Sequence, residues 1–544
     1  MRKTKNSSAG SDNGGELPAQ QRRLAVAIII LVFLAVTAMW WTRLPPIGTD
    51  CDEHLIVART FLRTGHFSVA DVHGTKYPPL LSSIAILFQV LGLNVPLALV
   101  ALNYLLILAT ALVLWRFLVK DGRIGLLSLL PVIYLLTNTV LWDSAKEIIA
   151  DTILFFLTAV ALLFALRVER WSVRATLLAS LIAFLATMSR SIGLVVIVPL
   201  ACSMIWDRRT RGQTPPYGGL ALLAVPAVAA LLLFMHYESR FGSHTTGYLE
   251  TFLLNDPFDA SKGRLTFASF LTRTLRGCLD SFRDLRDLTV YPSCAGAFSY
   301  ALPLVLLGFA CLPRPASASA SAAGARFGLR DSDKRRILLL CSFALAYLAV
   351  SCLWPYKGAR FVLPLLLLGA IGVNGALAWG MRRRAVAMVV VLLVIGHIAI
   401  SAVNLHRDAV EKKAARAFLL AGFDAMTEWC RANIPQRDPI ASFDYRELIL
   451  RLDRPVIPLA YDSDTAVQIA SLEREHARWL VVCFYIYPLR ATYAHSIVAA
   501  LGDRASKRFS NENCEVYELN LTASVPPGQL QREPGDGFSG VRPP

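Results

Sequence analysis

The sequence predicts an α-helical protein that crosses a membrane many times and carries a small α/β domain after its last span. Of its 544 residues, 55% are hydrophobic and only 17% are charged, whereas a soluble protein usually has about 25% charged residues. The hydrophobic residues gather in long runs up to residue 403. Beyond that point, short apolar strands alternate with helix-like stretches.

About eleven runs are candidate membrane spans, since a helix that crosses the hydrocarbon core needs roughly 20 mostly apolar residues. They lie at 24–41, 95–117, 124–142, 147–166, 175–189, 192–206, 217–236, 298–313, 337–354, 361–380 and 385–403. The first run is long, contains Trp40 and Trp41, and lacks a small-residue cleavage site. We therefore expect it to stay as a membrane anchor rather than to be cleaved as a signal peptide.

Basic residues cluster in every second gap between the runs, as they do in the cytoplasmic loops of membrane proteins. Examples are Arg22 with Arg23, Arg167 with Arg170, and the run Arg382, Arg383 and Arg384. This pattern places the N-terminus in the cytoplasm. The segments expected outside are 42–94, 237–297, the edges near 143–147 and 355–360, and everything after 403. Topology thus explains the net charge of +16, and nucleic acid is not expected as a partner.

The chain divides into four predicted regions. Residues 1–20 form a disordered cytoplasmic tail, 21–403 a transmembrane domain, 404–522 an extracytoplasmic α/β domain, and 523–544 a second disordered tail. Within the α/β domain we expect a helix at 404–434, strands at 455–459, 479–485 and 514–520, and helices at 463–476 and 491–501. This domain has no glycine-rich phosphate loop and no nucleophile elbow.

The ten cysteines show no metal-binding spacing. Cys278 with Cys294 is one possible disulfide on the outside. A second is a pair among Cys430, Cys483 and Cys514.

The first outer loop is rich in polar groups and reads GTDCDEHLIVARTFLRTGHFSVADVHGTKYPPLL from Gly48. Its acidic residues are Asp50, Asp52 and Glu53. One interpretation is a helix from about 51 to 64, with Asp50 as N-cap, Glu53 completing a capping box, and Gly65 ending the helix. The other is that the carboxylates perform catalysis or bind a metal. The two interpretations are compatible.

Two further clusters lie at the outer edges of later spans. Asp143, Glu147 and Asp151 are spaced by four residues, so one continuous helix would place these like charges on one face. Lys146 or a cation would have to compensate them. Arg190, between two apolar runs, is expected to bind phosphate or to extend toward the headgroups.

The last cluster is WPYKGARFVLP, which begins at Trp354 and precedes the tenth span. Its Lys357 and Arg360 are candidate phosphate ligands, because a guanidinium binds phosphate through two parallel hydrogen bonds. The alternative is that both residues only anchor helix ends among the headgroups.

Taken in order, the acidic loop, the Pro-Pro pair, the edge aspartate and Arg-Phe-x-x-Pro resemble the GT-C glycosyltransferases. The branch they resemble contains the lipid A aminoarabinose transferases and the protein O-mannosyltransferases. The resemblance implies that Asp52 is the catalytic base, with Glu53 as companion and Asp50 as fallback, and that Asp151 is also catalytic. The residues that it implies for donor-phosphate binding are Lys76, Tyr77, Arg190, Lys357 and Arg360.

The chain departs from the aminoarabinose transferases at one motif. They have Glu-Lys directly before Pro-Pro, whereas this chain has Lys76 and Tyr77 there, so the lysine is displaced by one position and the acidic neighbour is missing. This difference argues against the aminoarabinose activity itself. A divalent cation remains an open expectation, with Asp52, Glu53, Asp143 and Glu147 as candidate ligands.

The resemblance implies an enzyme that moves a hexose or pentose from a polyprenyl-phosphate donor to a protein, lipid or glycan acceptor, with inversion. It would act on the outer face of a membrane, expected to be the bacterial inner membrane. The alternative is a transporter or a receptor with an outer binding domain. A transporter would place its polar groups near the middle of the bilayer, whereas here they lie at the outer rim.

Overall fold

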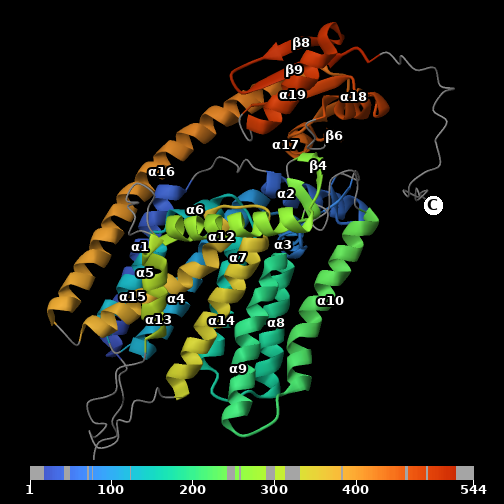
Figure 1. The fold of residues 1–544 in the computed structure, drawn as a ribbon. Helices are drawn as coiled ribbons and strands as arrows, with labels where there is room; N and C mark the ends of the chain where they lie inside the picture. Colours follow the sequence, from blue (N-terminus) through green and yellow to red (C-terminus); the bar gives the residue numbers. More distant parts are fainter. Residues whose placement is uncertain are drawn as a thin grey trace, which may run out of the picture.

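The computed structural model describes residues 17–41, 49–69, 73–75, 77–122, 124–241, 252–256, 259–289, 300–312, 331–381, 384–459, 464–484 and 488–521. Most of both predicted tails, together with Lys76 and Cys294, lies outside these residues. The described chain forms a bundle of apolar helices with a small α/β domain at one end (Figure 1). It is an α-helical membrane protein with many spans, as the sequence predicts.

The first half of the bundle and its outer loop contain α1 (Ala19–Trp40), α2 (Thr49–Thr64), β1 (Ser68–Val69), β2 (His73–Gly74), α3 (Leu80–Val90), α4 (Val95–Gly122), η1 (Gly125–Ser128), α5 (Leu129–Leu136), α6 (Thr139–Lys146), α7 (Asp151–Arg167) and α8 (Val173–Ser189). The second half contains η2 (Ser191–Val196), α9 (Ile197–Thr210), α10 (Tyr217–Phe241), β3 (Leu254–Asp256), β4 (Asp259–Arg264), α12 (Phe267–Thr289), α13 (Leu302–Cys311), α14 (Asp331–Leu353), η5 (Ala359–Leu365), α15 (Leu366–Gly380) and α16 (Arg384–Asn433).

Each of the predicted apolar runs coincides with an apolar helix, but their lengths differ. Among the described residues, seven helices are long and apolar enough to cross a membrane, or up to eight if one bent pair counts as a single span. In that pair, Gly125–Leu136 and Thr139–Lys146 meet at 53°. Asn138 lies at the bend and caps α6, its side chain accepting a hydrogen bond from the Leu141 backbone N–H. The expected eleven full-length spans are therefore not established.

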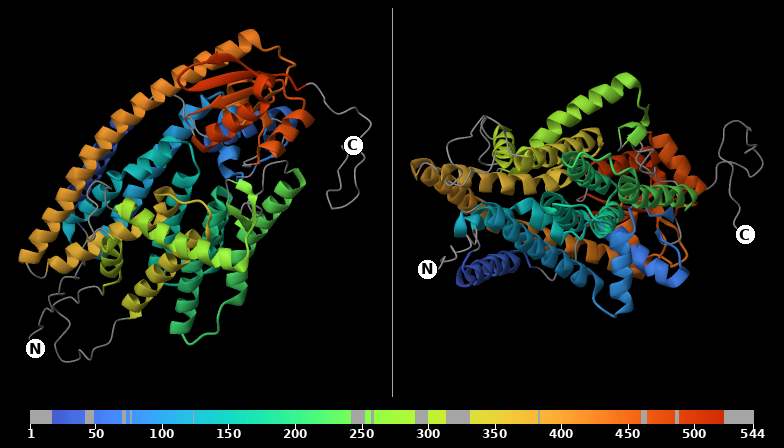
Figure 2. Two further views of the ribbon diagram at one scale, coloured as in Figure 1. Left: turned by 45° about the horizontal axis from the view of Figure 1, so that its top comes forward. Right: turned by 90° about the horizontal axis from the view of Figure 1, so that it is seen from below.

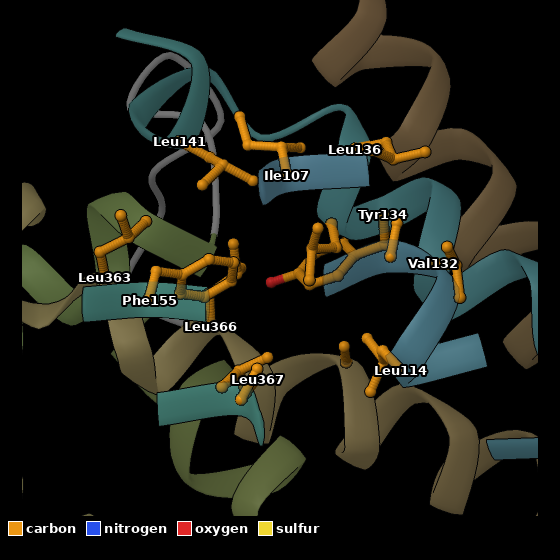
Figure 3. Close-up of a cluster of buried hydrophobic side chains, with 14 of the residues drawn as sticks. Ile107, Leu114, Val132, Tyr134, Leu136, Leu141, Phe155, Leu363, Leu366 and Leu367 are labelled. Atoms are coloured by element: carbon orange, nitrogen blue, oxygen red, sulfur yellow. The ribbon is translucent and has the colours of Figure 1, made fainter. Parts of the chain in front are cut away.

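The bundle core lies where α4, α5, α7 and α15 meet. Figure 3 shows Ile107 and Leu114 of α4 facing Val132 and Tyr134 of α5 and Phe155 of α7. The other labelled residues are Leu136, Leu141, Leu363, Leu366 and Leu367. Close packing of buried apolar side chains fixes the outer helix ends relative to one another. Those ends carry the polar clusters.

The long helix α16 joins the bundle to the α/β domain. It runs for 50 residues along the outside of the bundle and ends beside the sheet (Figures 1 and 2). The change of composition at residue 403 thus falls inside a helix. The helix is apolar in its first part and polar beyond it, so its middle turns carry charged residues such as Lys412 to the ends of the bundle helices.

The α/β domain contains β5 (Ile440–Ser442), α17 (Tyr445–Leu452), β6 (Ile457–Pro458), α18 (Thr465–Arg474), β7 (Trp479–Cys483), α19 (Pro488–Leu501), η6 (Gly502–Arg504), β8 (Ala505–Ser510) and β9 (Cys514–Leu519). The sheet has the order β6-β5-β7-β9-β8. Strand β5 is parallel to both neighbours, whereas β9 is antiparallel to β7 and β8. The predicted strands match β6, β7 and β9, but β5, β8 and α17 were not predicted.

The possible disulfide among Cys430, Cys483 and Cys514 is not formed in the structure. Cys483 and Cys514 face each other across β7 and β9, and their Sγ atoms are 3.6 Å apart. Both are free cysteines in the structure. Cys430, the third candidate, instead donates toward the sulfur of Met426.

Helix α12 lies across the outer ends of the bundle helices (Figure 1). Gly277 allows this approach, because a Cβ at this position would lie 2.2 Å from the Cys352 carbonyl oxygen of α14. On another face, Leu271, Leu275 and Leu279 are exposed at a spacing of four residues. Such a stripe is typical of a helix that lies in a membrane interface.

Candidate active site

The first part of the candidate site joins the start of α2 to the start of η5. The Tyr77 hydroxyl donates a hydrogen bond to the Asp50 carboxylate. Arg360 Nη2 lies 3.6 Å from Asp50 Oδ2. Asp50 therefore does not cap α2, which begins one residue earlier at Thr49. Its carboxylate faces the arginine of the Arg-Phe-x-x-Pro motif.

The second part joins α7 to the end of α8. Asp151, in the first turn of α7, forms an ion pair with Arg190, the C-cap residue of α8. Gly193 allows η2 to fold back on α8, because a Cβ there would lie 2.1 Å from the Ala186 carbonyl oxygen. This close packing holds Arg190 at the point where the chain turns.

Phe361 connects the two parts. The Arg190 and Arg360 guanidinium carbons lie 5.3 and 4.9 Å from its ring centroid, which allows cation–π attraction. Two arginines held close together repel each other, and the carboxylates of Asp50 and Asp151 reduce this repulsion. The side chains of Arg360 and Asp50 are 35% and 21% exposed. A ligand can therefore reach this cluster, which is suited to binding a phosphate.

Asp52 and Glu53 lie in a separate cluster beneath α17. Both are fully buried. Arg446 Nη2 is 2.9 Å from Glu53 Oε2, so the two side chains form a buried ion pair. The Thr75 hydroxyl donates to Glu53 Oε1 at 2.7 Å. Glu53 therefore joins the outer loop to the α/β domain.

Asp52 faces the carboxyl group of Glu447. Burial, and secondly the charge of Glu447, raise the pKa of Asp52 well above its usual range. Neither Asp52 oxygen accepts a hydrogen bond from an N–H or O–H group of the described chain. The repulsion between two carboxylates held this close disfavours the charged form of Asp52. Nearby, burial lowers the pKa of His54 to about 4, and this neutral imidazole contacts the Ser82 hydroxyl at 2.8 Å.

Raising the pH is expected to destabilise the packing of α17 on α2. Because the Asp52 pKa is raised in the folded protein, this group stabilises folding least at high pH. The free energy of unfolding begins to fall above about pH 4, which is the pKa of Asp52 in the unfolded chain. It continues to fall up to the pKa of Asp52 in the folded protein. Asp52→Asn should give a flatter curve and higher stability at about pH 8. Thermal denaturation in nanodiscs across pH tests this; a parent protein that becomes more stable with rising pH contradicts it.

The prediction that Asp143, Glu147 and Asp151 share one helical face is wrong. Helix α6 ends at Lys146, Ile148 has a positive φ of 49°, and α7 starts at Asp151. The break separates Asp151 from Asp143 and Glu147, which remain close enough to interact electrostatically. A β-branched residue rarely adopts such a φ, so nothing in the sequence indicates it.

Long helix α16 supplies cations to this region that sequence reasoning missed. Lys412 Nζ lies 2.8 Å from Asp143 Oδ1, and Arg416 and Arg360 both act electrostatically on Glu147. Arg416 is only 7% exposed, and its Nη1 has no hydrogen-bond partner in the described chain. Such a buried donor next to an acidic cluster is available to an anionic ligand.

Lys357 is directed away from the cluster around Phe361. Its Nζ donates to the Ser351 and Cys352 carbonyl oxygens at 2.5 and 3.3 Å, so it binds the end of α14. The next backbone N–H, of Gly358, donates to Asp284 of α12 at 2.9 Å. Burial lowers the pKa of Lys357. In this structure Lys357 positions the loop that precedes Arg360.

The described carboxylates do not form a metal site. Within the described ranges, no group of three or more His, Cys, Asp or Glu side chains is arranged to hold a metal ion. Asp52 and Glu53 contact Glu447 and Arg446, and Asp143 contacts Lys412. The described residues thus do not fit a resident cation, and the positive charge of the cluster around Phe361 comes from Arg190 and Arg360.

Comparison with known proteins gives matches by structure but not by sequence. No family model matches the chain, and no curated protein matches it. ArnT from Cupriavidus metallidurans bound to undecaprenyl phosphate is similar in structure, with a TM-score of 0.50 and 14% identity over 93% of this chain and 99% of that chain. The apo oligosaccharyltransferase of Archaeoglobus fulgidus has a TM-score of 0.51 and 12% identity over 94% of this chain and 76% of that chain.

Both similarities extend over nearly the whole of this chain, including the bundle and the α/β domain. At such low identity they establish the fold and leave the chemistry to the residues of this chain. The chain therefore has the fold of the GT-C superfamily of membrane glycosyltransferases, as its outer motifs indicate.

Proposed function

We propose that this protein is a glycosyltransferase that moves a sugar from a polyprenyl-phosphate donor to an acceptor on the extracytoplasmic face of a membrane. The observation that carries the proposal is the meeting of Asp50, Asp151, Arg190 and Arg360 around Phe361. These residues come from four separated segments and lie at the ends of helices. Similarity to a protein crystallised with undecaprenyl phosphate supports a polyprenyl-phosphate donor.

The proposed reaction is a direct displacement at the anomeric carbon. A base removes the proton of the acceptor hydroxyl, whose oxygen forms the new bond while the bond from the anomeric carbon to the phosphate oxygen breaks. The phosphate leaves with an additional negative charge, which Arg360 and Arg190 stabilise. A single displacement inverts the anomeric configuration. Retained configuration in the product contradicts this mechanism.

The geometry favours Asp50 as the base. Asp50 is partly exposed and lies next to Arg360, whereas Asp52 is fully buried beneath α17. The role that the family resemblance gives to Asp52 therefore requires α17 to move. Glu53 and Lys357 act in this proposal by positioning the outer loop and the Arg360 loop.

We expect Asp50→Asn to lower transfer by about 10²- to 10⁴-fold, since general-base catalysis contributes rate factors of that size. The assay measures the release of free polyprenyl phosphate from a panel of lipid-phosphate sugars, with purified protein in nanodiscs and membrane extract as the acceptor source. Asp52→Asn is the matched variant and should retain most activity. If instead Asp52→Asn abolishes transfer in a folded protein, the base is Asp52. Failure of the parent to release polyprenyl phosphate from any donor contradicts the proposed function.

The same proposal includes the location of the protein. We infer that the N-terminus is cytoplasmic, that the α/β domain is extracytoplasmic, and that the membrane is a bacterial plasma membrane. A requirement for a divalent cation is tested by chelation. Activity that a chelator abolishes and one metal restores would add a cation to the site.

A further inference from the structure

Two neighbouring cavities lie where the α/β domain meets the outer loop. The larger, of about 400 Å³, is at the edge of the sheet where β5 and β6 begin, and its lining includes Arg437, Arg454 and Arg474. The smaller, of about 80 Å³, lies between α2 and α17 and adds Arg59 and Arg63. Both are lined by Arg454 and Pro455. We call them together the arginine groove.

The lining of the groove carries an excess of positive charge. Its acidic side chains are Asp438, Asp453 and Glu475. Asp438 is already engaged, because Arg478 Nη1 lies 3.2 Å and Trp479 Nε1 3.4 Å from its carboxylate oxygens. The lining therefore has five arginines and three acidic groups. Of the acidic groups, only Asp438 is bound by residues of the described chain outside the lining. Clustered guanidinium groups of this kind bind phosphate and carboxylate through paired hydrogen bonds.

The buried arginine at the centre of the groove is Arg454. It is 7% exposed and donates a hydrogen bond to the Asp438 backbone carbonyl. A carbonyl oxygen fixes the direction of the guanidinium without neutralising its charge. Arg454 thus offers a preorganised positive charge to both cavities.

Helix α2 contributes to both the groove and the candidate active site, on different sides. Ile56, Arg59, Thr60 and Arg63 line the smaller cavity, and their spacing of three and four residues places them on one helical face. Asp50, at the start of the same helix, is nine residues before Arg59. At 1.5 Å per residue this corresponds to about 14 Å along the helix. Nine residues also turn the helix by about 180°, so Asp50 lies on the side of α2 opposite Arg59. An acceptor bound in the groove therefore has to pass around the first turns of α2 to reach Asp50.

We propose that the arginine groove binds a phosphate or carboxylate group of the acceptor, and so selects anionic acceptors. This inference rests on the proposed function. In the proposed function the donor phosphate binds Arg190 and Arg360 at Phe361, on the other side of α2's first turn. A second cationic site is therefore suited to the acceptor. The exposed arginines at the rim would attract the anion, and Arg454 would hold it.

Direct binding tests the groove independently of catalysis. The full-length protein is placed in nanodiscs of neutral lipid and titrated with inorganic phosphate and with a soluble sugar phosphate. We expect Arg59→Gln/Arg63→Gln and Arg437→Gln/Arg474→Gln each to weaken binding by about tenfold, because each pair removes charge-assisted hydrogen bonds. Lys507→Gln/Arg508→Gln is the matched control, since both residues lie on β8, at the opposite edge of the sheet from β6. Binding that is unchanged in both groove variants overturns the proposal.

Activity measurements then separate this inference from the proposed function. The groove variants should still release polyprenyl phosphate by transfer to water, but should show a raised KM for an anionic acceptor. If the parent protein does not cleave the donor, the proposed function is contradicted. The phosphate titration would still test whether the arginine groove binds an anion. If anionic phosphatidylglycerol in the nanodisc competes with phosphate only in proteins with an intact groove, the bound group is a lipid headgroup. If only the soluble sugar phosphate competes, it is a glycan phosphate.

Discussion

Replacing Arg360 with alanine is expected to lower sugar transfer by about 10²- to 10³-fold, the loss seen when one donor that stabilises a developing negative charge is removed. Arg360 lies 3.6 Å from Asp50 and stacks on the Phe361 ring beside Arg190. It is therefore oriented before the donor arrives. The measurement is kcat for polyprenyl-phosphate release at saturating donor, because an interaction made mainly in the transition state changes kcat more than KM.

Two variants control for charge and for general damage. Arg360→Lys keeps the positive charge but loses the planar fork, so an intermediate rate is expected. Arg264→Ala, on the exposed surface of β4, removes an arginine of the outer face away from Phe361 and should leave the rate unchanged. If Arg360→Ala has the kcat of the parent, Arg360 does not stabilise the leaving phosphate, and Arg190 is then the candidate for this role.

The helices were predictable because composition alone determines which segments enter lipid. A run such as 217–236 has no stable place in water, and in lipid its backbone must form a helix; the structure has α10 there. The C-terminal end of the outer helix was also predictable, whereas the expected N-cap residue, Asp50, lies inside α2. Gly65 ends α2 with a φ of +77°, because glycine adopts this conformation at little cost.

The break between α6 and α7 was not predictable. Ile148 carries the positive φ that separates Glu147 from Asp151, and isoleucine gives no signal for it. The surrounding packing imposes this conformation, since Ile148 is fully buried. Tertiary packing thus overrode the four-residue spacing that predicted one continuous face.

The sequence predicted that one of three acidic residues faces the arginines, but it did not predict which one. Sequence placed Asp50, Asp52 and Glu53 at the start of one helix, and each successive residue of a helix is rotated by about 100°. Which direction faces the site depends on what packs on the other sides. Helix α17 packs there and buries Asp52 and Glu53, although it is nearly 400 residues away in the chain. No local pattern records such a contact.

The second large effect is expected from Arg446→Ala, which should destabilise the contact between the α/β domain and the outer loop. The Glu53 side chain is fully buried, and that of Arg446 is 8% exposed. Removing one partner of a buried ion pair costs about 3 to 5 kcal/mol, because the remaining charge stays buried without compensation. Thermal denaturation in nanodiscs and the rate of proteolysis between α16 and α17 measure the effect. Arg451→Ala is a less suitable variant, because Arg451 pairs with both Glu447 and Asp424.

The double variant Glu53→Gln/Arg446→Met distinguishes structure from catalysis at this contact. It removes both charges while Gln can still accept the hydrogen bond from Thr75, so stability should return toward that of the parent. If transfer returns with stability, Glu53 positions the outer loop and takes no part in the chemistry. If stability returns while transfer remains lost, Glu53 acts in the reaction, and α17 must then leave α2 during turnover. A single Arg446→Ala variant as stable as the parent would show that the buried pair does not hold the domain in place.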